Sequence, residues 1–247
     1  MYVSVDSLPE LTQEYQHAQQ QAVQEAKVVY QYEGVIVPAT DYGAISIWSL
    51  FGLFSLWMMW IAVQDGLWAG VLLVILFSGG FLTYCYFAGN PDTKQTVTLT
   101  EKGMIVTELT LVPDACFAAL RYSGYVGVAI SIIGVVLVGP MMFVGAGAGL
   151  LMSLKMAGVV NRPKQRVQPF PPTASYRLCC VPEGRYKNGL IESHLFPIFE
   201  METESEENED IYWENRHFYF SYYIASPAEQ EQLLKHLRQL VTVIEEE

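Results

Sequence analysis

The cysteines are the side chains of this sequence with the most reactive chemistry. Cys179 and Cys180 are adjacent, and such a pair could serve as a redox site or an acylation site. Adjacent cysteines rarely form a structural disulfide, and their spacing matches no zinc-binding pattern. Cys85 lies in an apolar run and Cys116 stands alone. We therefore interpret all four as reduced packing residues, and we expect Cys179 and Cys180 to be dispensable.

The histidines offer acid–base or metal-binding chemistry, but they are scattered without ligand spacing. They are His17, His194, His217 and His236. The sequence also contains no GxSxG, HExxH, GxGxxG or Walker pattern. We therefore predict no catalytic residue, no cofactor, no metal site and no enzyme activity, and we interpret His194 and His217 as packing or edge residues.

Composition places much of the chain in lipid. The 247 residues are 51% hydrophobic and 16% charged, whereas about 25% of the residues in soluble domains are charged. The apolar excess is concentrated between Ala44 and Val160, and the first 25 residues lack the apolar stretch of a cleavable signal peptide. The net charge of −12 argues against a nucleic-acid partner, because phosphate binding depends on clustered Lys and Arg. The lipid bilayer is the first expected partner.

Two uncharged runs predict a first transmembrane hairpin over residues 44–88. Residues 44–63 and 67–88 each have about the 20 residues that cross a bilayer as a helix. Only Gln64, Asp65 and Gly66 separate them, which predicts a tight turn.

A third apolar stretch, residues 122–160, is too long for one span. As a single helix it would measure about 58 Å against a hydrocarbon core of about 30 Å. Gly139 and Pro140 lie near its centre, and proline disfavours helix at and before its own position. We predict a second hairpin with spans at 122–138 and 141–160. The alternative is one span followed by an interfacial helix through residues 145–160.

The distribution of basic residues predicts the orientation. Lys and Arg favour the cytoplasmic side, and the following cluster near the ends of the third and fourth predicted spans: Arg121, Lys155, Arg162, Lys164 and Arg166. With four spans every basic residue lies on one side. We therefore expect an integral protein of a bacterial cytoplasmic (inner) membrane, with both termini and residues 89–121 in the cytoplasm.

The predicted spans lack transport chemistry. Apart from Lys155 they contain no ionisable residue, which counts against ion-coupled transport. Small residues recur instead at spacings that allow close helix packing: Ser123, Gly127, Ser131, Gly145 and Gly149. These could pack the spans within one chain, form a homo-oligomer or, as a third option, line a pore.

The N-terminal segment, residues 1–43, predicts an amphipathic cytoplasmic helix. Ser7 and Glu10 form a capping-box pattern, and apolar residues then recur at helical spacing up to Val29. This helix could dock onto the rest of its own chain or onto a partner protein.

The remaining segments predict a small α+β domain. Residues 89–121 contain a β-hairpin with Glu101, Lys102 and Gly103 at its turn, and residues 161–174 form a proline-rich extended linker. In residues 175–247 we predict strands at 175–181, near 195–201 and at 211–225, then a helix that begins with the capping box of Ser226 and Glu229 and carries its apolar face to Ile244.

This order of elements is similar to small bacterial membrane proteins that bear pleckstrin-homology-like domains. The similarity concerns element order and implies a fold without implying a function. A second transmembrane hairpin inside such a domain would be a departure from that pattern. The predicted class is therefore a polytopic α-helical membrane protein, with four spans in two hairpins and a cytoplasmic α+β domain.

A binding surface is the function that these features favour. Aromatic anchors and charged rims give binding specificity, and the chain places Trp213, Phe218, Phe220 and Tyr222 beside an acidic loop containing Glu204, Glu206, Glu207 and Glu209. We predict a non-enzymatic membrane component that binds another membrane or cytoplasmic protein, as a subunit, assembly factor or regulator of a larger complex. Entry-exclusion and immunity proteins fall in this class. The alternative is a small oligomeric channel or transporter gated by the cytoplasmic domain.

Overall fold

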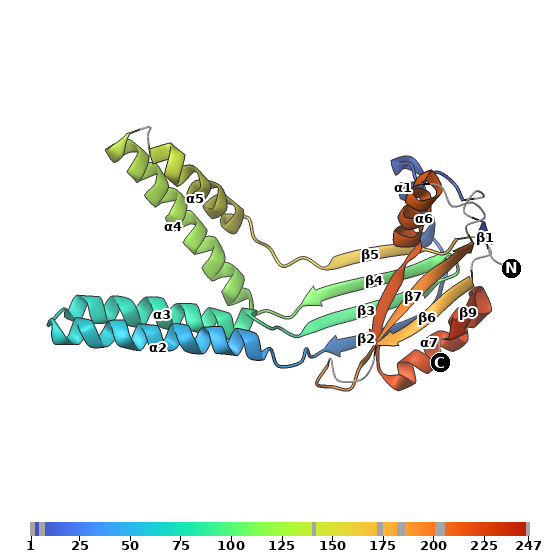
Figure 1. Ribbon diagram of the computed structural model, residues 1–247, viewed down its shortest axis with the longest axis horizontal. Helices are drawn as coiled ribbons and strands as arrows, with labels where there is room; N and C mark the ends of the chain where they lie inside the picture. The colour runs from blue at the N-terminus through green and yellow to red at the C-terminus, as the bar shows by residue number, and fades with distance from the viewer. Residues whose placement is uncertain are drawn as a thin grey trace. The chain divides into compact units, whose positions relative to one another are not determined.

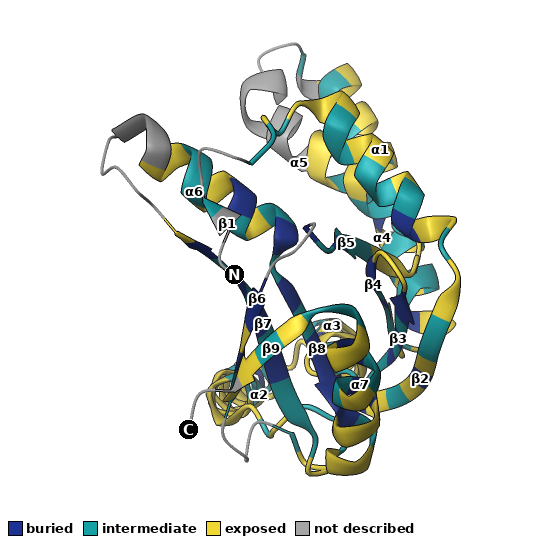
Figure 2. Cartoon of the chain, turned by 90° about the vertical axis from the view of Figure 1, so that its right-hand side faces the viewer, coloured by how far each residue is buried: buried dark blue, intermediate teal, exposed yellow. Residues whose placement is uncertain are grey.

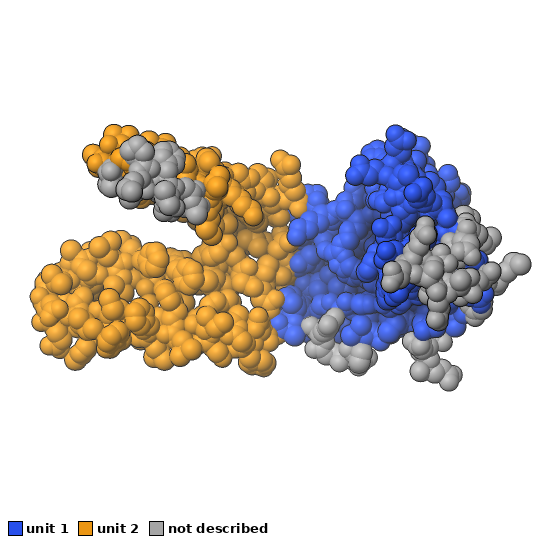
Figure 3. Space-filling view, turned by 45° about the horizontal axis from the view of Figure 1, so that its top comes forward, with its two compact units in different colours: residues 1–39, 93–109, 163–247 blue, residues 40–92, 110–162 orange. Residues whose placement is uncertain are grey.

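The computed structural model describes residues 3–4, 8–139, 142–171, 175–181, 186–200 and 206–245. The chain divides into two compact units, each assembled from segments that are far apart in the sequence (Figure 3). Unit 1 comprises Met1–Ala39, Thr93–Leu109 and Pro163–Glu247. Unit 2 comprises Thr40–Asp92 and Thr110–Arg162. In the described residues the structure has seven helices and nine strands (Figure 1).

A four-stranded sheet forms one half of unit 1. Its order is β2-β3-β4-β5, and its strands are β2 (Val28–Ile36), β3 (Thr93–Thr100), β4 (Gly103–Thr110) and β5 (Lys164–Pro169). The hairpin predicted around Glu101, Lys102 and Gly103 is present as β3 and β4. In antiparallel register Tyr32 lies opposite Val97, and Val106 lies opposite Arg166.

The predicted linker over residues 161–174 is wrong in its central part, because β5 lies there. Pro163 precedes the strand and Pro169 ends it. Proline is tolerated at such positions because β5 is the edge strand, where a missing N–H breaks no ladder.

A five-stranded sheet forms the other half of unit 1. Its order is β1-β7-β6-β9, with β8 also pairing with β7. The strands are β1 (Val3–Ser4), β6 (Ser175–Val181), β7 (Ile191–Glu200), β8 (Ser221–Ala225) and β9 (Thr242–Glu245). Of the strands predicted here, β6 has the predicted bounds and β7 begins four residues earlier than expected.

The strand predicted at residues 211–225 is wrong for most of its length, because helix α6 (Glu206–Tyr219) occupies it and only β8 is extended. Ile211, Asn215 and Tyr219 recur every four residues, so one helix face points inward. Residues 206–210 of the predicted acidic loop are the first residues of this helix, while residues 201–205 lie outside the described residues.

The two sheets share one core with helix α7 (Pro227–Leu240), and Figure 2 shows buried residues along the strands. The core residues with the least exposure are Val97, Leu99, Met104, Tyr176, Leu195, Tyr223, Leu233 and Leu237. Buried Gln95 joins the sheets: its Oε1 accepts a hydrogen bond from Ile224 N (3.0 Å) and its Nε2 donates one to Glu108 Oε1 (3.2 Å). Tyr32 adds a second link between the sheets by donating to Ile224 O at 3.0 Å.

The capping predicted for α7 is present, since the Ser226 Oγ accepts a bond from Glu229 N and the Glu229 carboxylate accepts one from Ser226 N. However, Ile244 lies in β9 and not on this helix. Helix α1 (Gln13–Gln24) is shorter than predicted: it begins after Thr12, and residues from Val28 onward form β2. The capping box expected at Ser7 and Glu10 therefore does not start a helix.

Unit 2 contains helices α2 (Tyr42–Gln64), α3 (Trp68–Ala88), α4 (Asp114–Val138) and α5 (Met142–Ala157). By length and composition α2, α3 and α4 could each cross a membrane, and at most 11% of their most apolar windows is buried. Helix α5 has only 16 residues. Helix α4 begins eight residues before the predicted span and ends at Val138, followed by Gly139, whose φ of 94° favours glycine.

Each helical hairpin has its own packing. In the first, Ser78 Oγ donates to Ser55 Oγ at 2.9 Å and the Phe51 and Phe81 rings lie 4.8 Å apart. In the second, Gly124 lies so close to α5 that a Cβ there would be 2.6 Å from Ala157 N.

Of the five predicted packing residues, Gly127 packs against Ser153 of α5, within the same hairpin. Ser123 and Ser131 donate their hydroxyls to carbonyls of their own helix, Leu120 O and Gly127 O. The surroundings of Gly145 and Gly149 lie outside the described residues.

Candidate functional site

The outer face of the five-stranded sheet carries a row of rings. Along β7, Ser193, Leu195 and Phe199 are buried whereas His194 and Phe196 are half-buried, because successive side chains point to opposite faces. His194 lies opposite Tyr222 of β8, so these two share the outward face. We call His194, Phe196, Phe220 and Tyr222 the aromatic strip.

The rings of the strip are in mutual contact. The centroids of Phe196 and Phe220 are 4.9 Å apart, those of His194 and Phe220 5.6 Å, and those of Phe220 and Tyr222 6.2 Å. Aromatic pairs at such distances contribute about 0.5–1.5 kcal/mol to stability, in addition to the free energy gained by burying their apolar area. The strip is therefore an ordered, partly exposed surface.

One end of the strip is closed by Arg216 of α6. Its guanidinium carbon lies 5.1 Å from the ring centroids of both Phe196 and Trp213 and 5.8 Å from that of Tyr212. Its Nη1 donates a hydrogen bond to the Tyr212 hydroxyl at 3.1 Å. Trp213 is 45% exposed. No carboxylate of the described residues forms an ion pair with Arg216.

The other end of the strip contains a second arginine in a different electrostatic state. The Arg166 guanidinium carbon lies 4.1 Å from the Tyr222 ring centroid. Its Nη2 lies 2.8 Å from Glu108 Oε2, and the Tyr222 hydroxyl donates to Glu108 Oε1 at 3.5 Å. The charge of Arg166 is therefore already paired, whereas Arg216 has no carboxylate partner among the described residues.

Two hollows border the strip. A cavity of about 630 Å³ is lined by Glu108, Glu192, His194 and Tyr222 among others. There Glu192 contacts His194 Nε2 at 2.8 Å through Oε1 and accepts a bond from the Tyr186 hydroxyl at 3.0 Å through Oε2.

A smaller cavity of about 330 Å³, beside Arg216, is lined by Cys179, Phe196, Pro197 and Tyr212 among others. The described residues contain no group of three His, Cys, Asp or Glu that could hold a metal.

The structure separates the predicted aromatic residues into three environments. Trp213 is exposed on α6, Phe220 and Tyr222 belong to the strip, and Phe218 packs against a small cluster formed by Phe199 and Tyr219.

The predicted acidic residues are less completely described. Glu209 is exposed on α6, the side chains of Glu206 and Glu207 are not described, and Glu204 lies outside the described residues. Glu209 takes part in none of the contacts described for the strip.

Sequence reasoning missed Phe196, His194, Arg166 and Arg216. Residues 195–199 are apolar on both faces of the strand, so no alternation of polar and apolar residues could have identified Phe196 as outward-facing. The role of Arg216 had no sequence signal either, because its ring partners come from two separate elements.

The cysteines play no part in the strip's contacts. Cys179 lies opposite His194 in the register and borders the smaller cavity. Cys180 is exposed, and its Sγ accepts a hydrogen bond from Gln230 Nε2 at 3.2 Å. Both are free thiols, as are Cys85 and Cys116.

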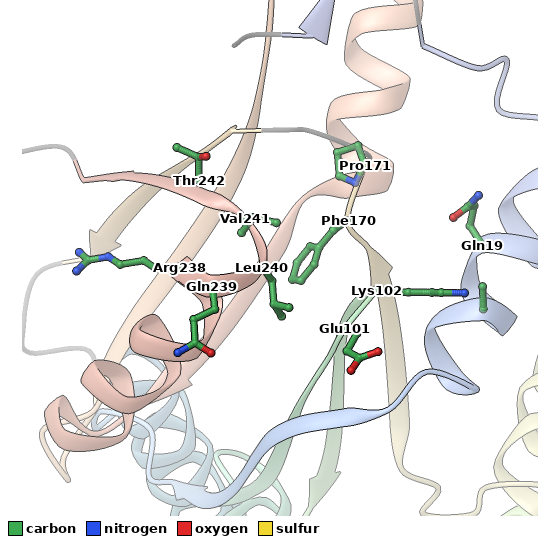
Figure 4. Close-up of a pocket in the computed structure, with 11 residues that line it drawn as sticks. Gln19, Glu101, Lys102, Phe170, Pro171, Arg238, Gln239, Leu240, Val241 and Thr242 are labelled. Atoms are coloured by element: carbon green, nitrogen blue, oxygen red, sulfur yellow. The ribbon is translucent and has the colours of Figure 1, made fainter.

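A further hollow of about 680 Å³ lies between α1, the β3–β4 turn and the end of α7 (Figure 4). Phe170 and Leu240 lie close together at its base and pack against the core, while Lys102 extends toward Gln19. On the inner side of α1, Val23 is 1% exposed, and a Cβ on Gly103 would lie 2.7 Å from it. The N-terminal helix therefore docks onto its own domain.

Comparison with known proteins identifies the family. A family model described as "TsiV2 immunity protein" matches residues 12–167, which contain α1 to α5 and β2 to β4 together with most of β5. The rings of the aromatic strip lie beyond residue 167. A curated relative, "Immunity protein TsiV2" of Vibrio cholerae serotype O1, is 32% identical over 79 residues, which cover 32% of this chain and 33% of the relative.

The curated match thus spans only about a third of the relative's length. No solved structure matches the chain. The family model, in contrast, covers more than half of the chain. The chain therefore belongs to the TsiV2 immunity protein family.

Proposed function

We propose that this protein protects the cell that makes it by binding a cognate toxin, of the kind that type VI secretion systems deliver as effectors. The family match carries this proposal, because immunity proteins act by neutralising a toxin and not by catalysis. Membership of the family confirms the expectation that the chain is not an enzyme. Immunity proteins were also within the class of binding proteins favoured by the sequence.

The proposed toxin-binding surface consists of the aromatic strip with Trp213 and Arg216. Trp, Tyr and Arg are the residue types that most often dominate binding energies in protein interfaces. The strip lies on an outward sheet face, flanked by two hollows that could receive partner side chains. The acidic residues Glu204, Glu206, Glu207 and Glu209 are proposed as a rim that steers approach, since exposed charges act mainly on association rates.

We further propose that unit 2 anchors the protein in a bacterial inner membrane through four crossings, with unit 1 and both termini in the cytoplasm. Chain connectivity supports this topology. The chain leaves β4 into α4 and returns from α5 into β5, and β4 and β5 are paired from Gly103 to Glu108. Strands on opposite sides of a membrane cannot pair. An arrangement in which α4 crosses alone is therefore disfavoured.

The same reasoning applies to α2 and α3, because β2 leads into α2, α3 leads into β3, and β2 pairs with β3. Helix α5 is the helix that fits a four-crossing topology least well, because it is short. Its 16 residues span only about 24 Å against a hydrocarbon core of about 30 Å. A short helix can be accommodated by local bilayer thinning and by snorkelling of flanking residues such as exposed Lys155.

A competition assay between siblings tests the proposed function. A strain that lacks this protein should be killed by its toxin-secreting parent and should be rescued by the intact chain. The chain carrying Phe196→Ser and Trp213→Ala should rescue poorly while accumulating to the same level. The absence of killing, or of a toxin that co-purifies with the wild-type chain, would contradict the proposal. Ion conductance by the purified protein alone would instead favour the channel alternative.

A further inference from the structure

Arg216 differs from the other arginine of the strip in having no acidic partner among the described residues. Three rings, those of Phe196, Tyr212 and Trp213, hold its guanidinium within 5.8 Å of their centroids. Arg166, in contrast, is neutralised by Glu108. Among the described residues, Arg216 is thus a positioned cation without a carboxylate partner at the α6 end of the apolar strip.

We propose that Arg216 binds a carboxylate of the toxin, while an apolar side chain next to that carboxylate packs on Phe196 and Phe220. This inference rests on the proposed function and specifies its partner: a segment in which an acidic residue adjoins an apolar one. A guanidinium has five N–H donors in a planar fork that matches a carboxylate. One nitrogen donates to the Tyr212 hydroxyl, which is the one hydrogen bond of this guanidinium within the described residues.

The aromatic contacts also lower the cost of binding. A free arginine side chain loses much rotamer freedom when it is immobilised in an interface. Here Arg216 is already positioned by the rings and by the 3.1 Å hydrogen bond to Tyr212. Guanidinium is also weakly hydrated compared with an ammonium group, so its transfer into a partly apolar contact is less costly.

The charges at the two ends of the strip fix the orientation of the partner. Glu108 and Glu192 line the larger hollow at the Tyr222 end, where a second carboxylate would be repelled. The smaller hollow beside Arg216 is lined by Cys179, Phe196 and Pro197 and also by Arg177, an arginine that has a contact of its own. An acidic residue of the toxin therefore belongs at the α6 end. A basic toxin segment would find no matching charge at Arg216.

The test compares substitutions that change charge and shape separately. The probe is the toxin that co-purifies with the wild-type chain from the competing parent strain, then purified and titrated against each variant. We expect Arg216→Glu and Arg216→Met to weaken binding by about tenfold or more, as for a central interface anchor. Arg216→Lys should give an intermediate loss, because it keeps the charge but not the planar fork.

Lys235→Glu provides the matched control. It makes the same charge change as Arg216→Glu at an exposed position of α7, away from the strip, and should alter affinity by about twofold or less. All variants should unfold at the wild-type temperature. Added salt should weaken wild-type binding more than binding of Arg216→Met.

The outcomes separate this inference from the proposed function. If the wild-type chain protects and binds but Arg216→Glu and Arg216→Met bind equally well, the carboxylate site is wrong and the immunity function stands. If Lys235→Glu lowers affinity as much as Arg216→Glu, the effect is one of net charge and the site is likewise overturned. If the wild-type chain neither protects nor binds a secreted toxin, both proposals fail.

Discussion

The two sheets of unit 1 share a core but differ in what their other surfaces do. Each strand of the β2–β5 sheet is continuous with one apolar helix of unit 2, and most of this sheet lies within the family match. The β1, β6–β9 sheet has no such connections and carries the aromatic strip beyond that match. We propose that the first sheet is common to the family and that the second carries the toxin-binding face.

The largest expected effect comes from a substitution in the core that the two sheets share. Leu195 of β7 is fully buried, and Leu195→Ala should lower the free energy of unfolding by about 2–5 kcal/mol because it removes packing and leaves a cavity. Denaturant unfolding of the detergent-solubilised protein measures this. Ile198→Ala, on the outer face of the same strand, should cost far less. Equal losses would mean that the outer face is also packed.

The hairpin of α4 and α5 in unit 2 can be destabilised without changing either sheet. Gly124→Leu should destabilise this hairpin by about 1–3 kcal/mol, because any Cβ there meets the α5 backbone and overpacking is costly. Thermal denaturation in detergent is the measurement. Gly79→Leu on α3 is the control, since a Cβ at Gly79 meets nothing within 4 Å. A larger effect at Gly79 would contradict the described packing.

High pH should weaken both halves of the core together. Burial raises the pKa of Tyr32 and Tyr176 well above the ordinary tyrosine value of about 10. Above pH 10 the unfolded chain therefore loses phenolic protons that the folded chain retains, so the contribution of these tyrosines to stability is constant below this pH and falls above it. The slope should be up to about 1.4 kcal/mol per pH unit for each such tyrosine. Tyr32→Phe should make the decline between pH 10 and pH 11 shallower, and an unchanged slope would contradict this.

The smallest effect is expected at the cap of α7, a helix that packs on the core shared by the two sheets. Ser226→Ala removes the acceptor for Glu229 N and should cost about 1 kcal/mol. Ser226→Asp should retain most of the stability, because aspartate also caps well. Comparing the two by chemical denaturation distinguishes the cap from a general effect of substitution. Neither change should affect toxin binding.

Elements with strong local signals were predictable from the sequence. The runs at residues 44–63 and 67–88 gave α2 and α3 nearly to the residue, because apolar length is a direct signal. The capping box at Ser226 located the start of α7 for the same kind of reason. Helix α6 was missed because a segment rich in aromatic residues is typical of a strand. The face of this helix that points inward can be recognised only from its packing against Phe199.

The candidate site was only partly predictable. Trp213, Phe220 and Tyr222 stand out as aromatic residues in a polar segment. Arg216 acquires its role from Phe196, a residue of another element, and from the lack of a described carboxylate nearby. Whether a charge is paired depends on the folded arrangement, which local sequence does not encode.

Site-specific photo-crosslinking in intoxicated cells tests the central claim most directly. A crosslinking amino acid placed at Trp213, in the exposed part of the proposed surface, should trap the toxin in cells that survive attack. The same group at Gln232, on the exposed side of α7, should trap none. A toxin crosslink from position 232 but not from position 213, in protected cells, would contradict the assignment of the toxin-binding face.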